Sequence, residues 1–464
     1  MTDGQREFDL NIEDVLDNWE VYHALREIIA NAIDEQRLTK TKNFEITREN
    51  NITKIRDFGR GLSYEHLTQN ENPEKLKNPE LVIGKFGVGL KDALATLFRH
   101  EIIVRIKSKH GDITLGKQKK HGFDINTLHA LISTPSESDF VGTEFSLSGC
   151  SEEDLLNAKR LFLIFSGEEV LDKLKFGEIL TKKSAVSNIY IKGVRVAEEE
   201  NFLFSYNITS LTTTMEKALN RERTNVGRKV YTDRVKSIIL SSKDPVVAKR
   251  LVDDLGKYEE GTQHEELKYN DICVHACRIL HSKNKVVFVT PQDQSTGKHL
   301  LDYAKGDGNE IITIPTIIQK KIHGIKDTEG NIMRDISQYR SEYTESFEFD
   351  FVPEEELTTS EKEVFSHKEK ILNLIGGKPE VVKEIKISET LRVGPSVCGV
   401  AGMWKPSDHQ IIIKRSELSN LRLFAGTLLH EIAHAKSGCP DVDARFEHML
   451  SDFLGQIAAD RIKS

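Results

Sequence analysis

The sequence has few cysteines, no long apolar run and no export signal at its start. Its five cysteines are sparse among 464 residues. An odd and sparse set does not build a disulfide framework, so a reducing compartment is favoured. No run of about 18 apolar residues occurs, so no membrane span is expected. The first residues, MTDGQREFDLNIEDV, are acidic and polar instead of cationic and apolar, so the cytoplasm is the expected location.

An excess of basic charge is also absent. The sequence has 65 Lys and Arg residues against 73 Asp and Glu residues, with a formal net charge of −8. No strong basic field therefore indicates nucleic-acid binding, and neither a nucleic acid nor a membrane is an expected partner. The 38% hydrophobic and 30% charged residues are typical of soluble globular proteins. At roughly 150 residues per domain, the length predicts about three domains.

The pattern of apolar and polar residues predicts an α+β multidomain protein. The first stretch, to about Ser148, has the pattern of a helix, a hairpin, a loop, a second helix and then strands. The expected helices there are Asp17–Gln36 and Leu90–Arg99, and the expected strands are Phe44–Thr47, Ile52–Asp57, Glu101–Lys107 and Thr143–Leu147.

The rest of the chain predicts strands and helices in three further regions. A βαβ-like rhythm is expected around residues 285–315, and the acidic stretch Asp350–Lys370 is expected to be a linker. Two helices are expected to close the chain. The expected strands are Asn188–Val196, Asn201–Tyr206, Lys285–Thr290, Glu310–Pro315, Val397–Trp404 and Gln410–Lys414, with a charged helix at Asn225–Ile239.

Three polar residues share one face of the first helix. Glu27, Asn31 and Asp34 are spaced by four and three residues, which places them together on one side of a helix. That side lies opposite the apolar stripe, so all three side chains are expected to point away from the core. A carboxylate near a γ-phosphate can orient a water for attack, and an Asn oxygen suits Mg²⁺ among waters and phosphates.

Three glycine-containing segments follow this helix. They are Asp57-Phe-Gly-Arg-Gly-Leu62 after a strand, Gly84-Lys-Phe-Gly-Val-Gly-Leu-Lys91 at the start of a helix, and Gly142-Thr143 before a strand. Glycines let backbone N–H groups approach phosphate closely, and a helix N-terminus favours an anion. The polar helix face and these segments, in this order, predict a nucleotide site.

The four pieces resemble the GHKL ATPases, which include gyrase B subunits, MutL proteins, heat-shock chaperones and histidine kinases. The resemblance covers about residues 17–147 and implies the Bergerat fold, a helix-backed mixed sheet with ATP under a mobile lid. It implies that Glu27 is the general base, Asn31 the Mg²⁺ ligand, and Asp57, supported by Thr143, the acceptor for the adenine amino group. The nucleotide-binding residues that it implies are Asn31, Asp34, Asp57, Gly59, Gly61, Gly84, Lys85, Gly87, Val88, Gly89, Leu90, Lys91 and Thr143.

Glu27 separates two branches of this family. Hydrolysing members carry this glutamate, whereas kinase members transfer phosphate to a His, and no phospho-acceptor His box precedes the motifs. The segments Asn188–Val196 and Leu219–Asn225 resemble a gyrase-type transducer, in which a basic side chain reaches the γ-phosphate. Arg223, with Arg221 as an alternative, is the candidate, although a basic helix start making salt bridges explains the same residues. Family members commonly dimerise on ATP, so the resemblance implies a homodimer through this domain.

A metal-binding pattern stands near the end of the sequence. In Leu428-Leu-His-Glu-Ile-Ala-His-Ala435, the imidazoles of His430 and His434 are one helical turn apart, so both can reach one Zn²⁺. Glu431 then lies beside the metal without being a ligand, and can take a proton from an activated water and pass it to a leaving amine. The helix is expected to end at Ser437-Gly438, with Pro440 beyond.

A catalytic zinc needs a third protein ligand and an open position. Glu447 on the next helix, about Asp443–Ile457, is the candidate because it is adjacent to that helix's apolar stripe. Asp441 is the second choice and His448 the third. The pattern resembles zincin metallopeptidases with a glutamate third ligand, over about residues 397–454. The resemblance implies that the strand near Gly399–Trp404 is the edge that pairs with an extended substrate peptide.

Two weaker features have ordinary explanations. Cys273-Val-His-Ala-Cys277 with His281 has ligand-type residues, but a half-buried helix with two small apolar thiols is the favoured interpretation. Trp19 and Trp404 are interpreted as packing residues.

The leading hypothesis is an ATP-regulated zinc endopeptidase that acts on a protein substrate, with ATP, Mg²⁺ and Zn²⁺ as cofactors. By analogy, such proteins resemble bacterial defence or stress modules, including antiviral ones. The alternatives are a chaperone-like ATPase with a structural or non-cutting zinc domain, and a MutL- or gyrase-like remodelling ATPase. The expected domains are a GHKL ATPase (residues 1–150), a transducer-like α/β domain (151–260), an α/β middle segment (261–350) and a small zincin-type metallopeptidase (351–464).

Overall fold

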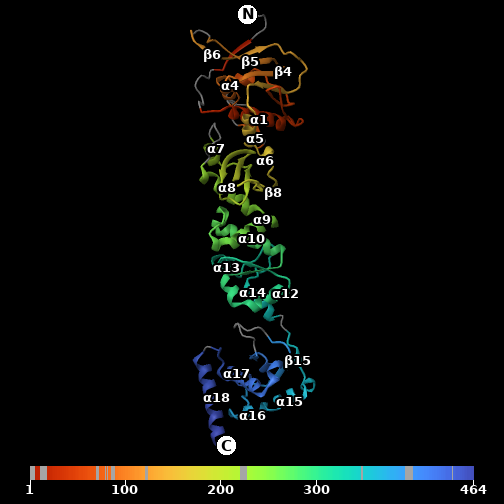
Figure 1. Cartoon of the computed structure of the whole chain (residues 1–464), viewed down its shortest axis with the longest axis vertical. Helices are drawn as coiled ribbons and strands as arrows, with labels where there is room; N and C mark the ends of the chain where they lie inside the picture. The colour runs from red at the N-terminus through yellow and green to blue at the C-terminus, as the bar shows by residue number, and fades with distance from the viewer. Residues whose placement is uncertain are drawn as a thin grey trace. The chain divides into compact units, whose positions relative to one another are not determined.

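The computed structural model divides into two compact bodies, residues 1–279 and 280–464. Both bodies contain helices and sheets, so the expected α+β multidomain architecture is confirmed (Figure 1). In the part of the chain that the structure describes, no helix is both long and apolar enough for a membrane span. The described residues are 6–10, 18–68, 73–78, 80, 82–84, 89–120, 124–219, 227–345, 348–391, 401–441 and 443–463.

Seven described strands form the first sheet, in the order β1-β6-β5-β4-β7-β3-β2. All of its strand pairs are antiparallel, so the expectation of a mixed sheet is wrong. The reason is that β7, from later in the chain, inserts between β3 and β4, which run parallel to each other. The strands are β1 (Arg6–Asp9), β2 (Glu45–Glu49), β3 (Ile52–Arg56), β4 (Ile103–Ser108), β5 (Asp112–Lys119), β6 (Asn126–Ser133) and β7 (Thr143–Ser148).

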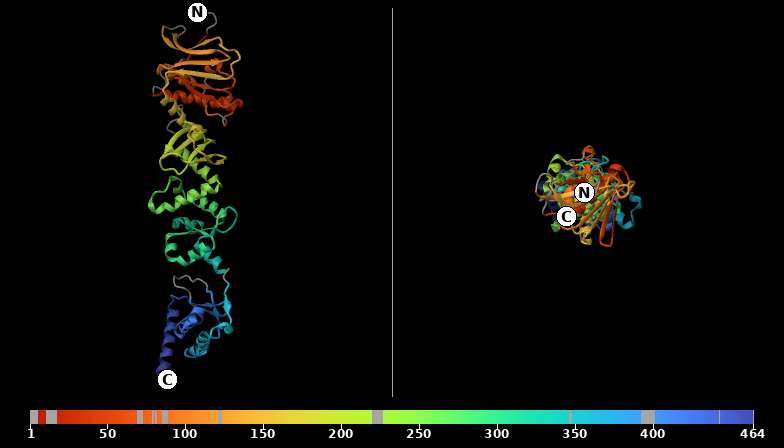
Figure 2. Two further views of the ribbon diagram at one scale, coloured as in Figure 1. Left: turned by 45° about the vertical axis from the view of Figure 1, so that its right-hand side comes forward. Right: turned by 90° about the horizontal axis from the view of Figure 1, so that it is seen from above.

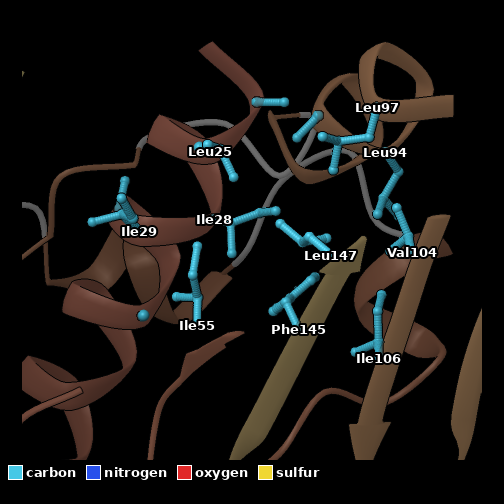
Figure 3. Packing of buried hydrophobic residues seen from close by; sticks show 14 of the residues in the cluster. Leu25, Ile28, Ile29, Ile55, Leu94, Leu97, Val104, Ile106, Phe145 and Leu147 are labelled. Atoms are coloured by element: carbon cyan, nitrogen blue, oxygen red, sulfur yellow. The ribbon is translucent and has the colours of Figure 1, made fainter. Parts of the chain in front are cut away.

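Helices α1 (Val21–Thr39) and α4 (Gly89–Arg99) pack against one face of this sheet. Figure 2 shows α1, in red, along the sheet, and Figure 3 shows the apolar side chains that fill the layer between them. Leu25 and Ile28 of α1 meet Phe145 and Leu147 of β7 in this core. The expected helices and strands here are confirmed to within a few residues. The other helices of this part are α2 (Glu65–Thr68), α3 (Pro73–Lys77) and α5 (Glu152–Arg160).

A second sheet, of five described strands, has the order β11-β10-β12-β9-β8. The expected single strand at 188–196 is a hairpin, because Lys192 and Gly193 adopt positive φ angles of 52° and 87° and reverse the chain. The elements of the region around the second sheet are α6 (Leu163–Ser166), β8 (Val170–Leu174), β9 (Gly177–Leu180), β10 (Ser187–Ile191), β11 (Val194–Glu199), β12 (Ser205–Ile208), α7 (Thr213–Ala218), α8 (Arg228–Ser241), α9 (Pro245–Leu255), η1 (Gly256–Glu260), η2 (Glu265–Lys268) and α10 (Asn270–Lys283).

The second body begins with a parallel strand pair. β13 and β14 pair in parallel with helices between them, which confirms the βαβ rhythm. The elements of this part are β13 (Val286–Val289), α11 (Pro291–Thr296), α12 (Lys298–Gly306), β14 (Glu310–Thr313), α13 (Thr316–Ile322) and α14 (Ile336–Glu345).

A four-stranded sheet of the order β15-β16-β18-β17 supports the end of the chain, with β17 at its edge. The linker expected at 350–370 is wrong, because Leu357 and Phe365 from this stretch are buried in the same core as the two closing helices. The elements are β15 (Phe351–Val352), η3 (Glu354–Glu356), α15 (Thr359–Ser366), α16 (Lys368–Asn373), β16 (Glu384–Ser388), β17 (Gly402–Lys405), β18 (Gln410–Lys414), η4 (Arg415–Ser419), α17 (Leu421–Ser437) and α18 (Ala444–Lys463).

Candidate functional sites

A cavity of about 630 Å³ in the first body brings together many of the residues that the sequence selects. Its volume is in the usual range for sites that take a cofactor-sized molecule. Further charged residues, among them Glu35, Arg60 and Lys75, line it as well. The sequence-predicted residues in its lining are Glu27, Asn31, Asp57, Gly61, Gly84, Gly89, Leu90 and Thr143.

Glu27 lies where the start of α4 meets α1. Its Oε1 accepts a hydrogen bond from Arg26 Nε at 3.1 Å and forms an ion pair with Arg26 Nη2 at 3.0 Å. A Cβ atom on Gly89, the first residue of α4, would lie 2.4 Å from Oε2 of the same carboxylate. The α4 backbone therefore approaches Glu27 closely because the residue there is glycine. This brings a carboxylate and a helix N-terminus to one wall of the cavity.

Asn31 and Asp34 share a contact with Lys75 of α3. The Lys75 ammonium donates to Asn31 Oδ1 at 3.0 Å and to Asp34 Oδ2 at 2.7 Å. Asp34 is buried, and its two oxygens also accept the backbone N–H groups of Ile83 (2.6 Å) and Gly84 (2.9 Å). The expectation that this side chain points away from the core is therefore wrong. Asp34 fixes the segment that leads toward α4.

Asp57 lines the same cavity, is buried, and comes directly after β3. Burial raises the pKa of its carboxyl to about 6. Its Oδ1 accepts the N–H groups of Gly59 at 2.9 Å and Thr143 at 3.3 Å, so Thr143 does support Asp57. Gly142 has a φ of +84°, and a Cβ there would lie 1.9 Å from the Asp57 carbonyl oxygen. Only glycine allows this approach of the two loops.

A chain of ion pairs that the sequence does not predict lies in the same cavity. Arg60 donates two hydrogen bonds to Glu35 at 2.9–3.0 Å, and two more to Glu74 of α3 at 2.8–3.0 Å. A Cβ on Gly59 would lie 2.3 Å from Glu35 Cγ, so this glycine makes room for the pair. Two features of the sequence could have indicated this pair. Glu35 is eight residues after Glu27 on the same helix, and Arg60 is inside the DFGRG segment.

Several predicted nucleotide contacts do not reach the cavity or lie outside the described residues. Lys91 is buried on α4 and is absent from the described lining of the cavity, and burial lowers the pKa of its ammonium. The residues outside the described part are Lys85, Gly87, Val88, Arg221 and Arg223.

The described residues nevertheless fit an adenine nucleotide. Asp57 is a buried acceptor beside apolar lining residues such as Ile55 and Phe145, which suits an adenine ring and its amino group. Gly84 and Gly89 line the same cavity as Asn31, and this combination suits phosphates and Mg²⁺.

A second cavity, of about 550 Å³, lies in the same body. Ile83 lines it, together with Phe162, Lys192 and Asn207 from the region of the second sheet. Gly193 N–H donates to Asn207 Oδ1 at 2.9 Å, and Asn207 donates in turn to Glu178. The segment held by Asp34 therefore lines both cavities, the first through Gly84 and the second through Ile83.

In the second body, α17 carries the candidate metal centre. The Nε2 atoms of His430 and His434 are 3.2 Å apart, and each lies 2.9 Å from Oδ1 of Asp441. In a tetrahedral zinc site with bonds of about 2.0–2.1 Å, neighbouring ligand atoms are roughly 3.3 Å apart. The three atoms thus form a triangle slightly smaller than one face of such a site, and nitrogen and carboxylate oxygen are ligands that zinc accepts.

The surroundings of His434 fix its orientation. Its Nδ1 lies 2.8 Å from the carbonyl oxygen of Cys439, so this nitrogen is the donor and Nε2 is free to be a ligand. The ring stacks on Phe446 of α18 with centroids 4.2 Å apart. Gly438 ends α17 with a φ of 65°, as expected, and this turn brings Asp441 back to the imidazoles.

Glu447, the first choice for the third ligand, lies apart from this cluster. Phe446 is the buried residue that α18 directs to the site, and the neighbouring Glu447 is exposed, since consecutive helical residues point about 100° apart. His448 is exposed too. Of the three candidates, the structure brings Asp441 to the two histidines.

Glu431 lies between the two histidines in sequence and against the edge strand in space. It is 5% exposed, and burial raises the pKa of its carboxyl to about 7. It accepts a hydrogen bond from the backbone of Trp404 on β17. A Cβ on Gly402 would lie 2.9 Å from Glu431 Cγ and 2.6 Å from Thr427 Cγ2. The position of β17 at the sheet edge confirms that part of the expectation.

The cysteines of α10 and the tryptophans pack as the sequence analysis favours. Cys273 and Cys277 are buried, which raises the pKa of both thiols, that of Cys273 to about 12. His281 is held by Asp327 and by the N–H of Arg334, so both of its nitrogens have partners. Trp19 is buried.

Comparisons with known proteins find relatives in Mycoplasma pneumoniae. Residues 153–245 match a family described as the Mycoplasma pneumoniae MPN635 N-terminal domain. One uncharacterized protein of that organism is 39% identical over 244 residues, which are 51% of this chain and 98% of the relative. Another is 21% identical over 341 residues, 67% of this chain and 93% of the relative.

Proposed function

The chain belongs to the same family as the Mycoplasma pneumoniae protein that is 39% identical to it, and we propose that it is an ATP-regulated zinc endopeptidase. The observation that carries the proposal is the triangle of His430, His434 and Asp441 next to Glu431 and an edge strand. The nucleotide-type cavity of the first body supports the regulatory half of the proposal.

The metal half of the proposal assigns a role to each residue around α17. His430, His434 and Asp441 would hold zinc, which, when bound, polarises a carbonyl and activates water. Glu431 is buried beside these ligands, so it is placed to take a proton from an activated water and to pass it to a leaving amine. Among the described strands, β17 is at the edge of its sheet, and an edge strand can pair with an extended peptide beside this carboxyl.

The nucleotide half rests on the cavity of about 630 Å³. Asp57 would accept the adenine amino group, and Asn31 would contribute an oxygen to Mg²⁺. Glu27 would orient the attacking water, with Arg26 holding its other oxygen in place. We propose that occupancy of this site controls cleavage, because binding can shift a conformational equilibrium that a distant site reads.

The peptidase proposal is tested by Glu431→Gln in the full chain. This change keeps the side chain's size but removes its proton-transfer role, so zinc should stay bound while new protein N-termini disappear from a host lysate supplied with ATP. A matched control is Glu417→Gln. Glu417 accepts a hydrogen bond from Thr427, which is on the same helix as Glu431, but Glu417 is not in the metal cluster. Identical N-termini from wild type and Glu431→Gln would mean that the peptidase proposal fails.

The nucleotide proposal has its own test. Glu27→Ala should keep ATP bound and stop its hydrolysis, whereas Glu20→Ala, at the exposed start of α1, should hydrolyse ATP as wild type does. ATP turnover that persists in Glu27→Ala contradicts the base assignment. ATP turnover without any ATP effect on cleavage favours a chaperone-like ATPase with a non-cutting zinc domain.

A further inference from the structure

Lys75 has an unusual position for a surface-helix lysine. Its side chain is 13% exposed, and its ammonium lies against two residues of α1. The distance from Nζ is 2.7 Å to Asp34 Oδ2 and 3.0 Å to Asn31 Oδ1. Neither residue is on its own element, so the contact ties α3 to α1 inside the cavity.

The neighbouring residue of α3 makes a second tie to the same cavity. Glu74 accepts two hydrogen bonds from Arg60, which is itself paired with Glu35 of α1. Bidentate pairs of this kind fix orientation as well as distance. Consecutive residues of α3 are thus attached to α1, one directly and one through Arg60.

The Lys75 ammonium occupies the oxygen that the nucleotide proposal gives to Mg²⁺. Asn31 Oδ1 accepts from Lys75 Nζ at a distance that places a positive charge beside it. Two cations that share one oxygen ligand lie only a few ångströms apart, and like charges at that separation repel strongly in a partly buried site. The contact of Lys75 with Asn31 and coordination of Mg²⁺ by Asn31 are therefore alternatives.

We propose that Lys75 is a tethered cation that holds the Mg²⁺ ligand in the nucleotide-free protein and must leave it when magnesium nucleotide binds. This inference rests on the proposed nucleotide site. The release of Lys75 from Asn31 leaves its 2.7 Å contact with Asp34 as the direct tie between α3 and α1, so magnesium, and not the nucleotide alone, loosens how α3 is attached. The apparent affinity for magnesium nucleotide is lowered by the fraction of molecules in which the contact is made.

The test is the affinity for a non-hydrolysable ATP analogue, measured by calorimetry on the full chain with saturating Mg²⁺ and with EDTA. Lys75→Met removes the competing charge. Its affinity should rise about three- to tenfold with Mg²⁺, as expected when 70–90% of molecules hold the contact, and should not rise with EDTA. Lys77→Met is the matched control, because Lys77 is an exposed lysine of the same helix, and its affinities should equal those of wild type.

The possible results distinguish a failure of the Lys75 inference from a failure of the proposed nucleotide site. A loss of affinity in Lys75→Met, with and without Mg²⁺, makes Lys75 a phosphate ligand and overturns the inference, as does an unchanged affinity. Wild-type protein that binds no analogue under either condition overturns the nucleotide site itself. Should Lys75→Met not fold, Lys75→Gln removes the same charge, keeps a hydrogen-bond donor for Asn31, and is read in the same way.

Discussion

Gly402 supports a prediction of stability that does not depend on any cofactor. This residue begins β17 and passes so close to α17 that a Cβ would lie 2.6 Å from Thr427 Cγ2, 2.9 Å from Glu431 Cγ and 3.1 Å from Glu431 Oε1. Thr427 is β-branched and stiff in a helix, and the Glu431 carboxyl is hydrogen-bonded to Trp404, so neither side chain can move away freely. In Gly402→Ala, the strand has to shift instead.

The expected size follows from overpacking. Forcing an extra methyl group into a filled contact typically costs about 1–3 kcal/mol. For a body of about 150–250 residues, each kcal/mol lowers the melting temperature by about 2–4 °C, so Gly402→Ala should lower the transition of the second body by about 2–12 °C. Because the shift moves β17 relative to Glu431, cleavage should fall by more than the loss of folded protein explains.

Gly426→Ala is the matched control for this prediction. Gly426 is an exposed residue inside α17, and a Cβ there meets nothing within 4 Å. The same substitution should therefore raise stability by up to about 1 kcal/mol through helix propensity. Calorimetry of both variants decides the matter, and a Gly402→Ala protein that melts at or above the wild-type temperature refutes the reasoning.

Three further predictions follow from the two sites. Burial raises the pKa of Asp57 to about 6 from 3.8, so the folded wild type loses stability as pH rises from about 4 to 6. In urea titrations, the stability of Asp57→Asn relative to wild type should therefore grow across this window and then become constant. A stability difference that is the same at every pH contradicts the raised pKa. Binding of adenosine, which needs the ionised carboxylate as acceptor, should weaken about tenfold per pH unit below pH 6. Asp441→Ala should bind zinc at least about tenfold more weakly in competition with a chelator, while Glu447→Ala should match wild type; the opposite result makes Glu447 the third ligand.

The sequence predicted those parts of the sites that depend on local spacing. Glu27 and Asn31 are one turn apart on a helix, as are His430 and His434, so their adjacency follows from helical geometry alone. Gly142 and Asp57 were joined only through the family resemblance, and the structure supplies their reason, the close approach of two loops.

The features that the sequence did not predict depend on contacts between distant segments. Lys75 reaches Asn31 across 44 positions, and Arg60 reaches Glu35 across 25, distances at which no periodicity carries information. The choice of Glu447 over Asp441 depended on the rotation of α18, where a single residue step decides which side chain is buried. The acidic composition of the stretch at 350–370 predicts a linker, yet Leu357 and Phe365 at its apolar positions pack into the core.

Ile83 and Gly84 have one consequence for communication within the first body. They are consecutive, a single carboxylate holds the N–H groups of both, and each faces a different hollow. If Gly84 rearranges around a phosphate, the peptide bond between them should move Ile83 as well. Ile83 lines the second cavity together with Lys192 and Asn207. The two cavities therefore share a wall at Ile83 and Gly84, and no long element is needed to connect them.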